Sequence, residues 1–575
     1  MTETINVRPL NGPPRPRKRQ ALEYAMLVLD RTPWPEALTI YEQKRSGPKR
    51  LVPFKAFVVG LIYYAVRFGK ERVPIKGIAQ ELHALSAEEK ASLGIHQLGI
   101  IQGIDYHQVW RTFDILRKVL DRQTCFGEEW VHPETGEILA MRDEANIPYS
   151  GLDAFIHELI RASIPEAQPA PVGLALDGTA IETYFTVKRD GPGSDDALQG
   201  KPDKPRRKPG DKIWFNADRP VPTDDRDARW GHRTTTPTNQ SEFYAGYEAH
   251  IAVDAWPKGT IEAPRVARGF LLAPAGTTRA IAGLTLLDLV AQACANQHPE
   301  GAAPNAGYPE NLYVDRGYSM HTAENWQLPL WQRGVNPTFD LADNQRTTRA
   351  SPFDDTIYVD GGLYSDALPQ TLKKKLPRPN PFNLDSEKLK ELTKKYDQRR
   401  AFAYSPHGAR NPENGHQRWK GPATAGTVRC MNNPASMTLK ETIPLTNCEE
   451  GEPCGCSGTL TVTPDEYARE SQWPPYQSSA WRKNYGARNA VESFNADARA
   501  NISSWQKGYT MVRTRGRTAL LLAGSVVGLN FHIVRNWHFK QRLQSPLDSE
   551  QWDYGAEPKN TRQRRTQTLS ERLDP

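Results

Sequence analysis

The chain has 575 residues, of which 38% are hydrophobic, so it is long enough for about three or four domains with a sizeable core. Its 74 Lys and Arg residues against 67 Asp and Glu residues give a net charge of +7, which by itself indicates no nucleic-acid partner. Six cysteines in a chain of this length exclude a disulfide scaffold, and no signal peptide opens the sequence. We therefore expect a cytoplasmic protein.

Both ends of the chain are basic and poor in apolar residues. The segments 8–20 and 559–572 are typical of tails that contact phosphates, and a solubilising tail explains the same composition. The longest apolar run, 518–534, is interrupted by Ser525, Asn530 and His532. These interruptions favour a buried core helix over a membrane span, so no membrane partner is expected.

Residues 21–165 are predicted to form a helical domain. Apolar periodicity indicates helices over 53–69, 74–85 and 105–122, and Asp105 and Gln108 stand at capping-box spacing at the start of the third. Consecutive short helices with basic faces fit a DNA reader of the helix-turn-helix type. A plain helical bundle fits the same pattern.

A sheet is predicted after the linker at 164–171. The apolar run 172–178 indicates a central strand with Asp177 at its carboxyl end. The elements that follow are strands at 243–255 and 265–274, a helix at 277–297, a strand at 311–319 carrying Asp315, and a helix at 322–334. Two insertions are expected, a polar one at 188–240 and a mixed one at 340–480 with strand-like pieces at 356–362 and 458–464.

Asp177 and Asp315 are the candidate metal ligands of this sheet. Neighbouring strands lie about 4.8 Å apart, so both carboxylates can reach one cation if the two strands are adjacent. Oxygen ligands of this kind suit Mg²⁺ or Mn²⁺, and two such ions support phosphoryl transfer. Asp360, in a second Tyr-Val-Asp sequence, is an alternative second carboxylate, although Gly361 and Gly362 beside it indicate a turn.

The segment 484–500 is predicted to be a helix that supplies a third carboxylate, Glu492. At about 100° per residue, Tyr485, Arg488, Glu492 and Arg499 fall on one stripe about 60° wide, opposite the apolar residues. A solvated salt bridge explains Arg488 and Glu492 equally well on this helix alone, since they stand at i and i+4. The two upstream aspartates favour a metal-binding glutamate flanked by arginines that hold phosphate groups.

These residues resemble the DDE transposases of bacterial insertion sequences, which have an RNase H-like catalytic core. The resemblance rests on residues 174–182, 244–254, 313–319 and 485–499, and it covers about 170–540. The last segment fits the signature Tyr-x2-Arg-x3-Glu-x6-Lys at its first three positions, whereas an arginine at 499 replaces the lysine. The replacement keeps the charge and changes its geometry.

The resemblance implies an α/β fold with an RNase H-like core and a β-rich insertion, preceded by an α-helical DNA-binding domain. The division that we expect is a basic arm at 1–20, a helical domain at 21–165, a catalytic domain at 170–540 that contains both insertions, and a basic tail at 541–575.

The same resemblance implies metal-dependent cleavage of DNA at transposon ends and joining of the freed 3′-OH to target DNA. The ligands of two Mg²⁺ or Mn²⁺ ions would be Asp177, Asp315 and Glu492. The contacts to the transposon-end backbone would come from Tyr485, Arg488 and Arg499. The expected partners are double-stranded transposon-end and target DNA and a second copy of the chain in a synaptic homodimer, at the nucleoid of a bacterial cytoplasm.

Two other functions stay open. An inactive or domesticated transposase would bind specific DNA without cutting it, and a stand-alone RNase H-like nuclease would cut without end specificity.

Four of the six cysteines lie in the second insertion: Cys430, Cys448, Cys454 and Cys456. A structural zinc needs four ligands in a tetrahedron, and the spacing of 17, 5 and 1 intervening residues is not a paired CxxC pattern. Gly455 permits the tight turn that the last two would need, and His407 and His416 are spare ligands. The spacing favours ordinary reduced thiols over zinc.

Overall fold

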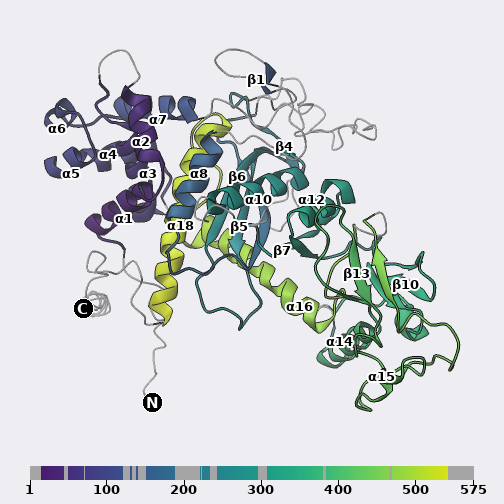
Figure 1. Cartoon of the computed structure of the whole chain (residues 1–575). Helices are drawn as coiled ribbons and strands as arrows, with labels where there is room; N and C mark the ends of the chain where they lie inside the picture. The colour runs from purple at the N-terminus through teal and green to yellow at the C-terminus, as the bar shows by residue number, and fades with distance from the viewer. Residues whose placement is uncertain are drawn as a thin grey trace, which may run out of the picture.

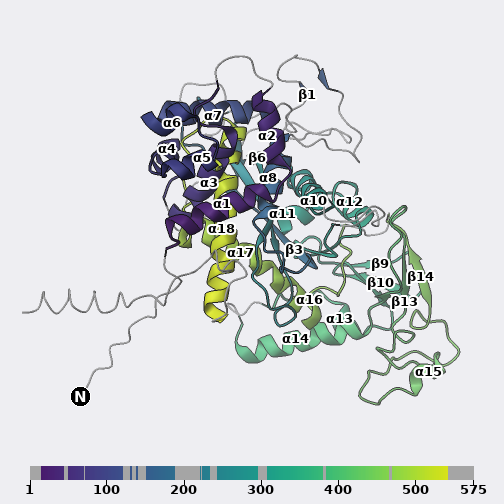
Figure 2. The same cartoon turned by 60° about the vertical axis from the view of Figure 1, so that its left-hand side comes forward.

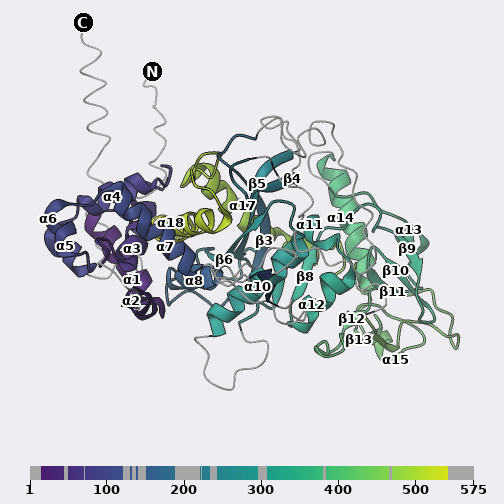
Figure 3. The same cartoon turned by 90° about the horizontal axis from the view of Figure 1, so that it is seen from above.

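The computed structural model describes residues 15–43, 49–69, 71–120, 130–131, 138–139, 151–187, 221, 223–232, 243–295, 307–379, 384–464 and 469–541. An N-terminal group of helices, a central sheet covered by helices and a β-rich lobe follow one another across the molecule (Figure 1, Figure 3). The mixed α/β class is confirmed. The predicted C-terminal tail and most of the polar insertion at 188–240 lie outside the described residues.

The N-terminal part consists mainly of helices, with one short strand pair before the last of them. These elements are α1 (Lys18–Asp30), α2 (Trp34–Gln43), α3 (Phe54–Phe68), α4 (Ile75–His83), α5 (Ala87–Ser92), α6 (Gln97–Gln102), α7 (Tyr106–Leu120), β1 (Trp130–Val131), β2 (Ile138–Leu139) and α8 (Gly151–Ala162). The three helices predicted from periodicity are α3, α4 and α7. At the start of α7 the capping box is formed, because Asp105 and Gln108 exchange backbone-to-side-chain hydrogen bonds of 2.8 and 3.0 Å.

Among the described residues the central sheet has six strands, in the order β4-β5-β3-β7-β8 with β6 also paired to β5. They are β3 (Gly173–Glu182), β4 (Arg229–His232), β5 (Phe243–Asp254), β6 (Ala267–Pro274), β7 (Asn311–Val314) and β8 (Asn336–Phe339). β5 runs antiparallel to β3, β4 and β6, whereas β3, β7 and β8 are parallel. β3 therefore lies between an antiparallel and a parallel neighbour.

The predicted strand at 172–178 is too short. β3 continues to Glu182 because β5 gives it an antiparallel partner as far as Gly246. Its parallel pairing with β7 does stop at Leu176. Asp177 therefore lies where the parallel neighbour ends, in the middle of its own strand.

Helices cover both faces of the sheet. They and the short elements around them are α10 (Arg279–Ala295), α11 (Arg316–Ser319), η1 (Ala323–Asn325), α12 (Gln327–Gln332), α16 (Ser479–Tyr485), η2 (Gly486–Arg488), α17 (Asn489–Ala496), η3 (Asp497–Asn501) and α18 (Arg515–Gln541). Leu174 and Leu176 of β3 pack in one core with α10 and α12. Ala175 enters the other core with α17 and α18. Because strand side chains alternate, Asp177 faces α17, which lies beside β3 (Figure 2).

α18 joins the N-terminal helices to the sheet. It packs on α3, on α8 and on β6, and its buried residues belong to the same core as those of α1, α3 and α7. By length and composition this helix could cross a membrane, but 83% of its apolar window is buried inside the protein. The core helix predicted at 518–534 is therefore confirmed.

The insertion between β8 and α16 forms the β-rich lobe. Its elements are β9 (Thr348–Ala350), β10 (Thr356–Val359), β11 (Gly362–Ser365), α13 (Gln370–Lys373), α14 (Ser386–Ala401), β12 (Ser405–Pro406), β13 (Gln417–Lys420), α15 (Pro434–Met437) and β14 (Thr459–Val462). They form two three-stranded sheets, β11-β10-β9 and β12-β13-β14. The sequence did not predict α14, which begins at a capping aspartate, Asp385, and carries mostly charged residues.

Candidate active site

Asp177 and Asp315 follow directly after two paired residues of adjacent parallel strands. Leu176 of β3 and Val314 of β7 are the last partners in the register, so the two aspartates stand next to each other at this end of the parallel pairing. Asp315 follows β7 and caps α11, where its Oδ1 accepts a hydrogen bond from the Gly317 N–H at 2.8 Å. The two strands are therefore neighbours, which is the condition for both carboxylates to reach one cation.

Glu492 comes from α17, on the face of the sheet toward which Asp177 points. Its carboxylate is 51% exposed and lies 2.9 Å from Arg488 Nη1. The other terminal nitrogen of the same guanidinium lies 4.0 Å from Asp177 Oδ1. The salt bridge considered from the sequence is thus present, and it connects Glu492 to Asp177.

Asp177 is the least exposed of the three carboxylates, with 13% of its side chain accessible. Its Oδ2 accepts a hydrogen bond from Asn495 Nδ2 at 3.1 Å. Burial, followed by the negative charges of Asp315 and Glu492, raises the pKa of Asp177 to about 7, although Arg488 partly opposes the shift. A cation beside this carboxylate would favour its charged form.

Arg279, at the start of α10, connects Asp315 to a fourth carboxylate. Its Nη2 lies 2.9 Å from Oε1 of Glu248, a buried residue of β5, and its Nη1 lies 3.5 Å from Asp315 Oδ2. The guanidinium therefore helps to orient Asp315 through Oδ2, the carboxylate oxygen that does not bind the Gly317 N–H. The sequence pattern indicated neither Arg279 nor Glu248 as a site residue.

Glycines in the two aspartate motifs make room for this network. A Cβ at Gly178 would lie 2.3 Å from Glu248 Oε1, and one at Gly317 would lie 2.1 Å from Arg279 Nη1. A larger residue would displace the carboxylate or the guanidinium. A glycine beside each aspartate is a sequence signal that another side chain packs closely against the backbone there. The glycine does not indicate which side chain that is.

His250 lies on β5 opposite Gly178 and supports the short helix that follows Asp315. Its Nδ1 is 2.9 Å from the Tyr318 hydroxyl, and among the described residues its Nε2 has no hydrogen-bond partner. Burial lowers the pKa of His250 to about 4, so the imidazole is neutral. This pair anchors α11, and with it Asp315, without adding charge.

The helix assumed over 484–500 is not uniform. It consists of α16, the tight turn η2, α17 and the π-helical segment η3. Tyr485 stacks on Trp481 with the ring centroids 4.6 Å apart, and burial raises its pKa to about 12. Arg499 lies in η3 and donates a hydrogen bond to the Thr179 hydroxyl of β3. The prediction of one uniform helix is therefore wrong, although Tyr485 is still close enough to Arg488 and Asp315 to interact electrostatically with both.

Arg499 also lines a cleft beside the carboxylates. The cleft has a volume of about 240 Å³ and includes Glu182, Lys507 and Tyr509 in its lining. Arg499 contacts Thr179 of β3, two residues beyond Asp177, so this side of the cleft lies close to that carboxylate along the strand. The sequence contained a signal for one further site residue, Asn495. It stands three residues after Glu492, so a helical wheel places both on the same side of the helix.

The three carboxylates are not gathered around one point. In the part of the chain that the structure describes, the only group of three or more His, Cys, Asp or Glu side chains with all ligand atoms within 4.8 Å of one another consists of cysteines. Arg488 lies between Asp177 and Glu492. Convergence of all three carboxylates on a cation therefore requires Arg488 to release at least one of its contacts.

Asp360, the alternative carboxylate, is an element of the lobe. Its Oδ2 accepts a hydrogen bond of 2.7 Å from Arg399 Nη1, and both side chains are 1% exposed. Arg399 also donates to the carbonyl oxygens of Leu372 and Lys374. The carboxylate is thus the partner of a buried guanidinium, and it belongs to a different core from that of Asp315.

The four lobe cysteines form the compact ligand group. The Cys430 and Cys454 sulfurs are 3.7 Å apart, as are those of Cys448 and Cys456, and all four lie within 4.8 Å of one another. None of the four forms a disulfide, and neither His407 nor His416 belongs to the group. This cluster is able to bind a metal ion. The preference for ordinary thiols rested on the sequence spacing, which cannot show how the loops fold back.

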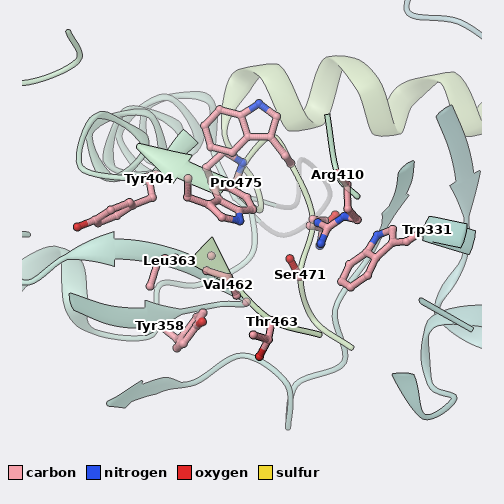
Figure 4. Close-up of a pocket in the computed structure, with 15 residues that line it drawn as sticks. Trp331, Tyr358, Leu363, Tyr404, Arg410, Val462, Thr463, Ser471 and Pro475 are labelled. Atoms are coloured by element: carbon pink, nitrogen blue, oxygen red, sulfur yellow. The ribbon is translucent and has the colours of Figure 1, made fainter. Parts of the chain in front are cut away.

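The lobe contacts the core of the protein at a small aromatic pocket. Its lining includes Trp331 of α12 and Tyr358, Tyr404 and Arg410 of the lobe (Figure 4). The Arg410 guanidinium lies 3.6 Å from the centroid of the Trp331 ring, and burial lowers its pKa to about 10. The cavity of about 20 Å³ holds roughly one water molecule, so this pocket is a packed seam rather than a ligand site.

Comparison with protein-family models, with curated protein sequences and with solved structures finds no significant match to this chain.

Proposed function

We propose that this protein is a DNA transposase with an RNase H-like core that cuts transposon ends and joins the freed 3′-OH to target DNA. The observation that carries the proposal is the alignment of Asp177 and Asp315 on adjacent parallel strands, with Glu492 connected to Asp177 through Arg488. Three carboxylates from distant parts of the sequence, close to arginines, form a site suited to metal-dependent phosphoryl transfer.

The order of elements around the site supports an RNase H-like core. The strand with the first aspartate is followed by the short strand β4, then by β5, which runs antiparallel to it, and by β6. A helix and a parallel strand that ends just before the second aspartate come after them. A further parallel strand, the lobe and a helix with the glutamate come next. The sequence alone predicted this succession, apart from the strands at 229–232 and 336–339, which it did not identify.

The donor set fits Mg²⁺ or Mn²⁺. All three predicted ligands are carboxylates, which these cations prefer, and Asp177 is buried beside other negative charges that a cation would offset. The Oδ1 atom of Asn495 is buried without a hydrogen-bond partner among the described residues, although its Nδ2 is bonded to Asp177. When bound by Asp177, Asp315 and Glu492, two such ions would activate an attacking oxygen and stabilise a leaving one.

The surrounding residues would hold the carboxylates and the DNA. Asn495 orients Asp177, and Arg279 with the Gly317 N–H orients Asp315. Arg488 balances the charge of Asp177 and Glu492 in the absence of DNA, and it would move to a phosphate group as the carboxylates converge. Arg499 and Lys507 line the adjacent cleft and would contact the DNA backbone.

The proposed partners are double-stranded DNA and a second copy of the chain. Cutting and joining two transposon ends requires two active sites to be held on one piece of DNA, which a synaptic dimer provides. The helices of residues 18–162 are the proposed DNA reader, because they lie apart from the lobe, and most of them join the sheet through α18 (Figure 3).

Cleavage of the DNA that flanks the gene tests this function. We expect the full-length protein with Mg²⁺ to nick both flanks at fixed positions and to leave a 3′-OH at each element end. Asp177→Asn and Glu492→Gln should lose cleavage and retain binding to the same fragments, whereas the exposed control Glu324→Gln should cut like the wild type. Products are mapped by sequencing gels and affinities by mobility shift.

Three results would change the proposal. Specific binding without cleavage by the wild type at any Mg²⁺ or Mn²⁺ concentration favours the inactive, DNA-binding alternative. Cleavage without fixed positions favours a nuclease. Substantial cleavage by Asp177→Asn or Glu492→Gln removes that residue from the metal site.

A further inference from the structure

The four lobe cysteines have the geometry of a closed tetrahedral metal site. Zinc–thiolate bonds of about 2.3 Å place the sulfurs of a tetrahedron about 3.8 Å apart. Two of the sulfur pairs are separated by 3.7 Å, and the remaining separations do not exceed 4.8 Å. The ligands come from three stretches of the chain, one with Cys430, one with Cys448 and one with Cys454 and Cys456, so only the fold brings them together.

A pair of disulfides does not account for this arrangement. A disulfide requires a sulfur–sulfur distance of about 2.05 Å, and every close pair in the cluster is well beyond it. Two separate disulfides would also not require all four sulfurs to lie close together. Four thiolates meeting in a partly buried space repel one another unless a cation lies between them.

The surroundings of the sulfurs are built to hold thiolates. Asn432 Nδ2 lies 3.5 Å from the Cys454 sulfur, and the Ser365 hydroxyl lies 3.2 Å from the Cys456 sulfur. Asn432 is itself held by the carbonyl oxygens of Glu449 and Glu452, at 2.9 and 2.8 Å. Hydrogen bonds of this kind orient metal ligands from the second coordination sphere.

The turn between the last two cysteines is fixed by backbone packing. A Cβ at Gly455 would lie 2.3 Å from the Asp355 carbonyl oxygen, so no other residue fits without movement. The Tyr404 hydroxyl donates a hydrogen bond to the Gly455 carbonyl, and the Ala423 N–H donates to the Cys456 carbonyl at 2.9 Å. These contacts place both sulfurs on the same side of the turn.

We propose that Cys430, Cys448, Cys454 and Cys456 bind one Zn²⁺, which stabilises the fold of the β-rich lobe. Four protein ligands leave no open coordination position, so the ion is structural. It ties the loops around 430, 448 and 455 to the sheet β11-β10-β9 through Ser365. The site is separate from the carboxylates, and the proposal does not depend on the proposed DNA chemistry.

Metal analysis of the intact protein tests the proposal. We expect full-length protein purified without chelator and with a thiol reductant to contain about one zinc per chain by plasma mass spectrometry. Cys448→Ser and Cys456→Ser should lose most of it. Cys294→Ser, which changes a partly buried cysteine of α10 outside the cluster, should retain it. Replacement by Co²⁺ should give the visible spectrum of a tetrahedral thiolate site.

A measurement on the wild-type ligands covers the case in which the serine variants fail to fold. Titration of the Cys294→Ser protein with an organomercurial should release its zinc to a colorimetric chelator as the cluster thiols react, and proteases should then cut within 421–458 faster than before. The proposal is overturned if zinc is absent both after purification and after incubation with equimolar Zn²⁺ under reducing conditions. The proposal is also contradicted if the four cluster thiols react with the organomercurial equally fast with and without bound zinc. Zinc content is independent of cleavage, so either proposal can fail alone.

Discussion

Two Tyr-Val-Asp sequences in this chain have opposite roles in the structure. In both, the aspartate follows the last residue of a strand, β7 for Asp315 and β10 for Asp360. Asp315 begins a helix, is 28% exposed and lies 3.5 Å from Arg279, which it shares with Glu248. Asp360 has a φ of 46°, is 1% exposed and lies 2.7 Å from Arg399.

The difference shows what turns a strand-end carboxylate into a candidate ligand. Asp360 faces a guanidinium that is buried with it and has no other carboxylate partner among the described residues, so the pair is closed. Asp315 shares its arginine, has a partly exposed side chain and stands next to Asp177 in the strand register. Exposure and a neighbouring carboxylate distinguish the two, and the local sequence contains neither.

The largest effect that we expect is from Asp315→Asn, which should reduce cleavage at least about a thousand-fold, because a neutral amide is a poor ligand for Mg²⁺. Asparagine can still accept the hydrogen bond from the Gly317 N–H, so the melting temperature should change little. Cleavage rates under single-turnover conditions and thermal melts of the same samples measure the two effects. A large loss of stability would place Asp315 with Asp360 as a structural residue.

Asp360→Asn should show the opposite pattern. Removing one partner of a buried ion pair leaves the Arg399 charge uncompensated, which typically costs about 3–5 kcal/mol of unfolding free energy. Asparagine tolerates the left-handed backbone at this position, so the cost arises from the charge. Denaturant unfolding provides the measurement, and adding Arg399→Met should recover part of the loss. Loss of cleavage in a fully folded Asp360→Asn protein would contradict the assignment.

Asp177 should make the stability of the metal-free protein depend on pH. Its pKa of about 7 in the folded protein exceeds the ordinary value of 3.8, so between those values the folded state holds a proton that the unfolded state has released. Unfolding free energy therefore falls as the pH rises from about 4 to about 7, and this carboxylate contributes at most about 4 kcal/mol of the fall.

Asp177→Asn removes that titration. In chelator-treated samples the variant should melt above the wild type at about pH 8 and close to it at about pH 4.5, since the asparagine carries no charge at either pH. Added Mg²⁺ should raise the melting temperature of the wild type only, and more at the higher pH. Equal melting curves of the two proteins at both pH values would show that the pKa of Asp177 is not raised in the folded protein.

The smallest effect that we expect is from Arg499→Ala, which should weaken binding to the flanking DNA roughly fivefold. The slope of log affinity against log salt concentration should become shallower by about one, since one fewer counterion is released. Arg499→Lys should retain most of the affinity, because the charge beside the cleft remains. Arg418→Ala, an exposed arginine of the lobe, is the control. Unchanged affinity of Arg499→Ala would leave its hydrogen bond to Thr179 as a purely structural contact.

The local sequence pattern was sufficient to predict the elements that are stabilised by their own residues. The apolar helices after Pro53 and Pro74, the capping box at Asp105 and the buried helix over 518–534 all have a periodicity or a cap that requires no distant partner. Patterns also predicted that strands precede Asp177 and Asp315. They did not predict how far β3 extends, because that length depends on pairing with β5.

The sequence by itself determined the α/β class, the order of the carboxylates and the side of α17 that carries charge. Only the tertiary structure decided which arginine pairs with which carboxylate, that Glu248, Arg279 and Asn495 belong to the site, and that four irregularly spaced cysteines meet at one point. The physical reason is that helix and strand periodicity act over a few residues. Ion pairs and thiol clusters depend on register and on loop return across separations that range from 24 residues between Cys430 and Cys454 to 318 between Asp177 and Asn495, and local sequence carries no record of these.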